Sequence, residues 1–336
     1  MSKTTTAAAI ALGFIFIIVN FAGNCYAAAA LQFGFYDRKC NDPDVEAIVG
    51  DVIATTIKDN PTLVAALLRL QFHDYFVNGC DASILLDGKD SEKTALPNRS
   101  VRGFEIIDAA KAAVEAKCSG IVSCADIIAM ATRDAVSWSG WGRYEVQTGR
   151  RDVLVSLASN VDIPSPSVSV RDSIQAFARK GLGVANMVYL LGGHTVGVAH
   201  YRSFKDRLYN FHNTGLPDPR MSPLLLSSLR SRCPQNATFD SNTADLDQNP
   251  RSALVVDNSF YRQIILNRGV LQIDQELALS PRTQGRVMCA AHARDFAPRF
   301  ALAMVKMGAV EVLTGSKGEI RSSCRVVNNP TSSIIG

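Results

Sequence analysis

The stretch LLRLQFHDYFVNGCDASILL, residues 67–86, joins a helix that carries a base to a loop rich in oxygen atoms. Apolar residues recur through its first half and no helix breaker follows Pro61, which predicts a helix that begins near Pro61. Arg69 and His73 are four residues apart and therefore lie on one face of that helix. Because burying a cation beside a base is costly, we interpret the pair as a candidate catalytic site.

The second half of the stretch interrupts the helix and offers ligands for a hard cation. Asp74, Asp81 and Ser83 place two carboxylates and a hydroxyl around Gly79. Calcium prefers such oxygen atoms on a tight loop. Taken singly, each signal has an ordinary explanation, because a lone His is usually a core or surface residue and such a loop is usually a turn. Their adjacency favours a functional site.

Two motifs give the chain a resemblance to a known family. Arg69-x-x-Phe72-His73-Asp74, followed by Val77-x-Gly79-Cys80-Asp81-Ala82-Ser83, resembles the distal haem motif of the secretory plant peroxidases, the class III haem peroxidases. Leu191-Gly-Gly-His194-Thr195-Val-Gly197 resembles their proximal haem motif. The similarity runs from about Phe33 to Asn328. It implies a mainly α fold whose two helical halves, about residues 31–160 and 161–336, sandwich a b-type haem.

The resemblance assigns the residues that would act at the haem. His194 is expected to be the axial ligand of the iron, with Asp274 of Gly269-Val-Leu-Gln-Ile-Asp274 accepting from its other ring nitrogen. His73 is expected to act first as base and then as acid on hydrogen peroxide. Arg69 would stabilise the developing negative charge, and Phe72 would keep the pocket narrow. The two glycines before His194 are expected to let a flat cofactor approach the backbone.

Two further positions follow from the resemblance. Asn98 is expected to accept a hydrogen bond from His73, although Asn98-Arg-Ser100 is also a glycosylation sequon. We favour the buried role and regard Asn236-Ala-Thr238 as the better glycosylation candidate. The stretch VDIPSPS, residues 161–167, is a loop because its prolines exclude a helix. There the carbonyl of Pro164, with Ile163 beside it, would bind aromatic donors.

The resemblance also implies two Ca²⁺ ions. The distal site is expected to use Asp74, Val77, Gly79, Asp81 and Ser83, with Glu92 supporting the network. The proximal site is expected to use Thr195, Asp247, Ser252 and Asp257. The loop between its two Asp residues is about two residues longer than the family's pattern, which leaves Ser252 less well defined.

Cysteine usage agrees with the family only in part. The resemblance implies the disulfides Cys40–Cys118 and Cys124–Cys324. In two other bridges of the family, one cysteine is replaced here. Tyr75 occupies the position of the cysteine that would pair with Cys80, and Tyr201 occupies that of the cysteine that would pair with Cys233. Cys289 is an additional thiol. Each lost bridge could forfeit ~2–4 kcal/mol of stability, and pairing between the two orphaned thiols is an open alternative.

The N-terminus predicts export. Lys3 precedes the apolar segment 7–19 and the small residues 27–30, so residues 1–30 read as a secretory signal peptide. The alternative, a membrane anchor, is disfavoured because the apolar segment is short. A net charge of +4 permits adhesion to an acidic wall polysaccharide. The sequence has no basic run with interleaved aromatic residues, so it gives no indication of nucleic-acid binding. We expect a monomer without a membrane span.

The rest of the chain predicts helices with few strands. Helical patterns cover residues 44–60, 103–116, 121–134, 170–180, 222–232, 258–267 and 297–310, and we find no convincing paired strands. Residues 244–257 read as irregular. The family pairs Asp126 with Arg150 in a structural ion pair. His200 is expected near a haem propionate, and His212 and His292 are expected at the surface.

These features together predict a secreted haem peroxidase. It would reduce hydrogen peroxide to water and oxidise phenolic donors in one-electron steps, in cell-wall phenolic oxidation, peroxide removal or the response to oxidative stress. One alternative is a secreted peroxidase-fold protein of weak or no activity that binds the wall, because two disulfides are incomplete. An intracellular ascorbate-type peroxidase is disfavoured by the signal peptide and the disulfide pairs.

Overall fold

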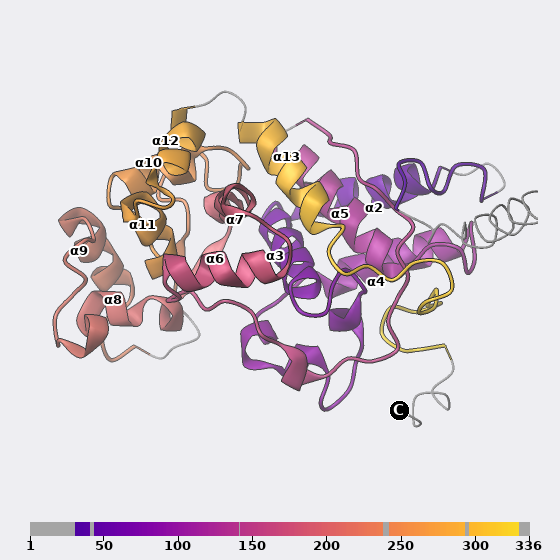
Figure 1. Ribbon diagram of the computed structural model, residues 1–336, viewed down its shortest axis with the longest axis horizontal. Coiled ribbons are helices and arrows are strands. Elements are labelled where there is room, and N and C mark those ends of the chain that lie inside the picture. The colour runs from indigo at the N-terminus through magenta and orange to yellow at the C-terminus, as the bar shows by residue number, and fades with distance from the viewer. Residues whose placement is uncertain (1–30, 41–43, 141, 238–241, 293–295, 329–336) are drawn as a thin grey trace, which may run out of the picture.

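The computed structural model describes residues 31–40, 44–140, 142–237, 242–292 and 296–328 (Figure 1). The predicted signal peptide lies outside the described residues. Within the described part of the chain, no helix has the length and apolar character that crossing a membrane requires. Helices dominate the structure, which confirms the prediction of a mainly α fold.

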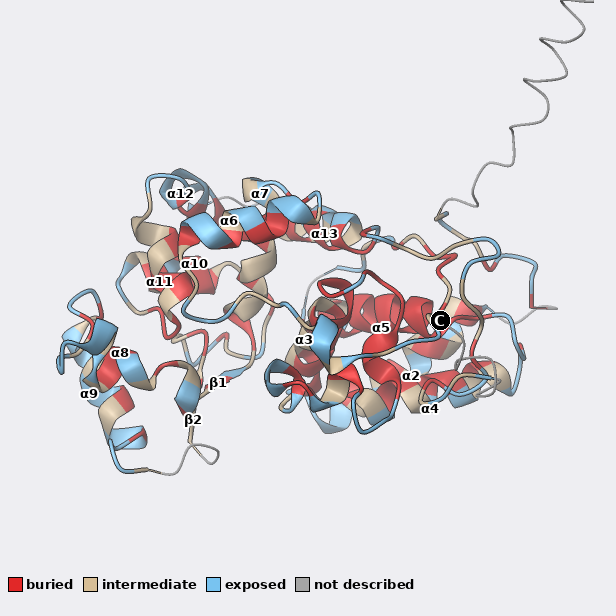
Figure 2. Ribbon diagram, turned by 60° about the horizontal axis from the view of Figure 1, so that its bottom comes forward, coloured by how far each residue is buried: buried red, intermediate tan, exposed pale blue. Residues whose placement is uncertain are grey.

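Four helices build the N-terminal part: α2 (Val45–Asp59), α3 (Leu63–Tyr75), α4 (Phe104–Glu115) and α5 (Cys124–Trp138). Asp44 caps α2 by accepting hydrogen bonds from two backbone N–H groups of its first turn. Helix α5 is buried along nearly its whole length because α2, α3 and α4 all pack against it (Figure 2). This apolar packing holds α3 and its chemical residues rigid.

Eight helices follow: α6 (Val170–Arg179), α7 (Val184–Leu191), α8 (Lys205–Tyr209), α9 (Pro223–Arg232), α10 (Ser259–Ile265), α11 (Gln272–Leu279), α12 (Gln284–His292) and α13 (Phe296–Met307). Helices α8 and α9 lie at the end of the molecule opposite α2 and α4, while α13 packs along α7 (Figure 1). Short 3₁₀ turns cover Ser83–Leu85, Glu92–Thr94, Leu96–Asn98, Ala158–Asn160, Gly192–Thr195, Tyr201–Ser203 and Phe211–Asn213.

One small sheet was not expected from the sequence. Strand β1 (Val198–His200) pairs antiparallel with β2 (Thr243–Asp245), with Ala199 opposite Ala244. The interpretation of residues 244–257 as irregular was therefore wrong for the first two residues, which belong to β2. Three-residue strands are too short to show an alternating pattern, and their pairing joins segments far apart in sequence.

The segment that follows α13 returns to the N-terminal helices. Cys124 and Cys324 form a disulfide with Cα atoms 5.7 Å apart, and Asp152 pairs with Glu319 through two backbone hydrogen bonds. The second expected disulfide, Cys40–Cys118, is also present. The boundary near residue 160 stays a prediction, but the C-terminal tail is covalently tied to the N-terminal half.

Two buried features replace or support covalent links. Arg150 Nη1 lies 2.7 Å from Asp126 Oδ1, which confirms the expected ion pair.

Cys80 and Cys233 are buried free thiols, so they do not pair with each other. Tyr201 is fully buried, and its hydroxyl donates to the Pro234 carbonyl at 3.0 Å. A hydrogen bond thus joins the segments that the missing bridge would have joined.

Candidate active site

The distal base is held on the buried face of α3. His73 is 7% exposed, and its Nδ1 lies 2.7 Å from Oδ1 of Asn98. Asn98 Nδ2 donates to the Glu92 carbonyl at 2.8 Å, which fixes Oδ1 toward the imidazole. Burial first, and then the charge of Arg69, lower the pKa of His73 to about 3. The imidazole is therefore neutral, with its proton on Nδ1 and an acceptor lone pair on Nε2.

The guanidinium of Arg69 reaches that lone pair. Its Nε donates to His73 Nε2 at 3.2 Å, while its Nη atoms donate to the carbonyls of Ser100 and Pro97 at 3.0 Å. Burial lowers the pKa of Arg69 to about 10, with help from the charges of Arg202 and Arg102. The group stays charged at neutral pH. The helical spacing predicted this side-by-side placement, and the loop carbonyls orient it.

Asn98 is buried, as its expected role beside His73 requires. The side chain is 2% exposed, and both ends of its amide are engaged inside the protein. A sugar on Nδ2 would break the bond to Glu92 and require the loop to open. Asn236 is exposed, although Thr238 of its sequon lies outside the described residues.

The second imidazole belongs to a short turn after α7. His194 Nδ1 lies 2.8 Å from Oδ1 of Asp274 on α11, and Asp274 is fully buried. Burial opposes the charged imidazole, but the charge and hydrogen bond of Asp274 outweigh it and raise the pKa of His194. The ring of His194 is 31% exposed, so it presents an open edge. A Cβ on Gly192 would meet the Tyr261 hydroxyl at 2.2 Å, so packing against Tyr261 requires this glycine, whereas a Cβ on Gly193 would only touch Phe300 at 4.0 Å.

The two motifs meet at one site. A Cβ on Gly197, three residues after His194, would lie 2.8 Å from Ala65, one turn before Arg69 on α3. The charge of Arg69 opposes the rise in the pKa of His194. Phe72 is half-buried, stacked at 6.3 Å on Phe177.

These residues fit a haem. One imidazole has a carboxylate on Nδ1 and an open edge, as an iron ligand requires. The other motif supplies a neutral base and a fixed cation, which suit the handling of a peroxide proton and a developing negative charge.

The distal loop gathers buried acids. Asp74 accepts hydrogen bonds from the N–H groups of Ala82 and Ile84. Burial, and then the charges of Asp81 and Glu92, raise the pKa of Asp74 well above its usual range. Burial, opposed by the nearby Ser83 hydroxyl, raises the pKa of Glu92 to about 8.

Three side-chain oxygens of this cluster lack hydrogen-bond partners among the described residues. Neither carboxylate oxygen of Glu92, nor the hydroxyl of Ser83, makes a well-formed hydrogen bond to another described residue. Buried acids with unsatisfied oxygens fit a divalent cation. No three His, Cys, Asp or Glu side chains of the described residues converge as metal ligands. A calcium site with two carboxylates, a hydroxyl and backbone carbonyls does not need three.

The two expected carbonyl ligands already accept hydrogen bonds. The Val77 carbonyl accepts from Lys180 Nζ at 2.7 Å. The Gly79 carbonyl accepts from the Asp81 N–H at 2.9 Å. The contact with Lys180 was not foreseen from the sequence.

The expected proximal calcium residues also lie together. Thr195 Oγ1 donates to Asp257 Oδ1 at 3.1 Å, and Ser252 Oγ donates to Asp247 Oδ2 at 2.7 Å. Burial raises the pKa of Asp247. Ser259 also contacts Asp247, at 3.3 Å, and sequence reasoning missed it because its spacing matches no motif.

The remaining residues named from the sequence lie on a loop, at the end of a strand or at the surface. Pro164 and Ile163 are half-buried on their loop, and the Pro164 carbonyl accepts no hydrogen bond from the described residues. His200 lies at the end of β1. His212 and His292 are exposed, as expected.

Comparison with known proteins agrees with this geometry. The sequence model of the family described as Peroxidase matches residues 49–293. Peroxidase 60 of Arabidopsis thaliana is 48% identical over 317 residues, which cover 93% of this chain and 94% of that protein. Peroxidase 57 of the same plant is 49% identical over 303 residues, 90% of this chain and 94% of that protein.

Proposed function

Because the chain belongs to the peroxidase family, we propose that it is a secreted haem peroxidase that reduces hydrogen peroxide and oxidises phenolic donors. It is an oxidoreductase with peroxide as the acceptor. One observation carries the assignment: α3 holds a neutral imidazole beside a charged guanidinium, and a buried carboxylate orients a second imidazole in a segment that packs against α3 at Gly197.

The distal residues divide the proton chemistry. With haem bound, Nε2 of His73 would take a proton from one oxygen of hydrogen peroxide and return it to the other oxygen, which would leave as water, and the haem would supply the two electrons. Asn98 keeps the other ring proton on Nδ1 and thereby leaves Nε2 unprotonated, as a base requires. Arg69 stabilises the negative charge that grows as the O–O bond lengthens.

The proximal residues hold the cofactor. Haem b, bound through His194, would supply the redox-active iron. Asp274 accepts the Nδ1 proton, which fixes the ring and makes Nε2 a more electron-rich ligand. The second oxygen of Asp274 is buried without a hydrogen-bond partner among the described residues.

Two Ca²⁺ ions would bind to the protein, one at the distal loop and one near His194. The distal ion is supported by the unsatisfied oxygens of Glu92 and Ser83 beside Asp74 and Asp81. The proximal ion is supported by two carboxylates and the hydroxyls beside them: Ser252 and Ser259 contact Asp247, and Thr195 contacts Asp257. Since Asp74 follows His73 directly, the distal ion would also fix the base.

The loop at Pro164 supports the proposal that the donors are phenols. Its half-buried ring and unoccupied carbonyl offer an apolar contact and an acceptor for a phenol hydroxyl. We further propose that the mature protein is an extracellular monomer. Its net charge of +4 would favour adhesion to acidic wall polysaccharide.

The alternative, a wall-binding protein without activity, has less support. The relatives named above are peroxidases, and the two tyrosines that replace cysteines are buried and hydrogen-bonded rather than disruptive.

The decisive experiment mixes haem-loaded protein with hydrogen peroxide in a stopped-flow instrument, with a phenol added afterwards. We expect a fast change in the haem absorbance that the phenol reverses, and three thiols titratable in the denatured protein. His73→Leu should slow the first change by several orders of magnitude, whereas His212→Leu, an exposed control, should leave it unchanged. Haem that ignores peroxide in the unmodified protein would favour the wall-binding alternative.

A further inference from the structure

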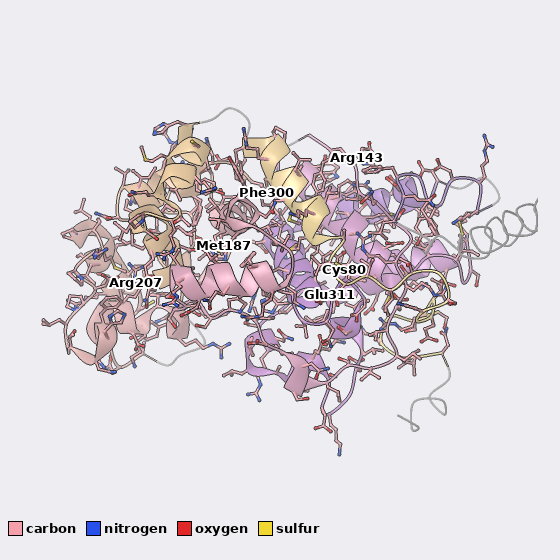
Figure 3. The ribbon with its side chains drawn as sticks, in the orientation of Figure 1. Cys80, Arg143, Met187, Arg207, Phe300 and Glu311 are labelled. Atoms are coloured by element: carbon pink, nitrogen blue, oxygen red, sulfur yellow. A yellow bond between two sulfur atoms is a disulfide. The ribbon has the colours of Figure 1, made fainter. Side chains whose placement is uncertain are left out.

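The distal loop is held by the end of α13 rather than by a disulfide. The Cys80 N–H donates to the Val310 carbonyl at 3.2 Å, and Cys80 Sγ contacts the Met307 carbonyl at 3.3 Å. Gly79 packs so closely that a Cβ there would lie 2.4 Å from the Glu311 carbonyl. Figure 3 shows Cys80 and Glu311 near each other at this end of α13.

A lysine completes this contact. Lys180 caps the C-terminus of α6, and its Nζ donates both to the Val77 carbonyl at 2.7 Å and to Glu311 Oε2 at 2.5 Å. The lysine side chain is 16% exposed, whereas that of Glu311 is 49% exposed. Both line a surface hollow of about 390 Å³. Solvent therefore reaches the glutamate and weakens its neutralisation of the ammonium.

This contact bears directly on cation binding. Val77 supplies one of the carbonyl oxygens expected to bind the distal Ca²⁺. An ammonium on the same oxygen would stand about 4–5 Å from the ion, where two positive charges repel each other strongly. The lone pairs of that oxygen are also divided between two cations.

We propose that Lys180 sets the calcium affinity of the distal loop by competing with the ion at the Val77 carbonyl. Glu311 acts as the counter-ion that limits this competition. The inference rests on the proposed distal calcium site. It makes Lys180 and Glu311 positioning residues, because they act on His73 only through the loop that begins at Asp74.

Calcium binding to the haem-loaded protein, followed by isothermal titration and by competition with a chelating dye, tests the proposal. Lys180→Met should tighten distal binding by about tenfold or more, since it removes the competing charge. Lys180→Arg should stay within about threefold of the unmodified protein, because the charge remains. Glu311→Gln should weaken binding, and it should have no effect in the Lys180→Met background, because the glutamate acts through the lysine.

The controls separate the possible failures. Lys306→Met changes a lysine of the same hollow that contacts Asn186 instead of the loop, and should not alter calcium affinity.

Asp81→Asn identifies the distal ion. If Asp81→Asn leaves the calcium stoichiometry unchanged, the distal site and the inference both fail. If the site exists but Lys180→Met binds calcium equally or more weakly, the lysine is only a structural clamp and the inference alone fails. Should Lys180→Met not fold, Glu311→Gln decides: unchanged or tighter binding would overturn the proposal.

Discussion

The hydrogen bond between Asn98 and His73 can be tested by placing a charge on the acceptor. Asn98→Asp keeps the shape of the side chain and places a carboxylate where Oδ1 now lies, 2.7 Å from His73 Nδ1. Like the control described below, it also removes the Nδ2 donor to the Glu92 carbonyl. The opposite charge favours the protonated imidazole, so it should raise the pKa of His73.

The magnitude follows from the present environment of the imidazole. Burial and Arg69 now lower the pKa of His73 to about 3, so the free base predominates above about pH 4. A carboxylate at hydrogen-bonding distance should raise that pKa by ~1–3 units, to between about 4 and 6. The base form is then lost as the pH falls through this range. At pH 5 its population would drop to between about 90% and about 10%.

The assay is the rate of the first reaction with hydrogen peroxide, measured by stopped flow without donor between pH 4 and pH 8. The unmodified protein should show no titration of His73 in this range, whereas Asn98→Asp should lose rate below about pH 6, up to about tenfold at pH 5. Asn98→Ala is the matched control. It removes the acceptor without adding charge, so the rate should fall by ~10–100-fold at every pH. If the Asn98→Asp profile superimposes on that of the unmodified protein, His73 is not the base or Asn98 is not its partner.

Three further outcomes are expected. Asp274→Asn keeps the hydrogen bond to His194 but removes the charge, so the haem reduction potential should rise in a spectroelectrochemical titration; an unchanged potential would contradict the role of the carboxylate. Arg150→Met leaves Asp126 buried and unpaired, and should lower the free energy of unfolding by about 3–5 kcal/mol in urea, against less than about 1 kcal/mol if the pair is dispensable. Tyr201→Phe removes only the hydroxyl that reaches Pro234 and should cost about 1 kcal/mol in the same assay. No loss would mean that this hydrogen bond does not stand in for the missing bridge.

Local geometry could be read from the sequence. A helix from Leu63 to Tyr75 places Arg69 and His73 on one face whatever surrounds it, because the helical repeat alone fixes a spacing of four residues. The polar loop after it is likewise a local consequence of Asn78 and Gly79 interrupting the apolar pattern.

Pairings across the chain needed either the resemblance or the structure. Asp274 lies 80 residues from His194, and no periodicity connects them, so only the family motif named the acceptor. The resemblance also supplied the Asp126–Arg150 pair and the two disulfides. It gave no account of what replaces the lost bridges.

Tertiary structure alone decided how the distal loop is held. Lys180 is 103 residues from Val77 and 131 residues from Glu311, yet one ammonium contacts both. Each of these residues reads as ordinary in sequence, since a lysine after a helix is usually solvated. Side-chain patterns report which face of an element is buried, whereas the partner that meets that face depends on how the elements pack. The sequence therefore determined the helix, the base and the candidate ligands, and the packing of α6 and α13 determined which charges surround them.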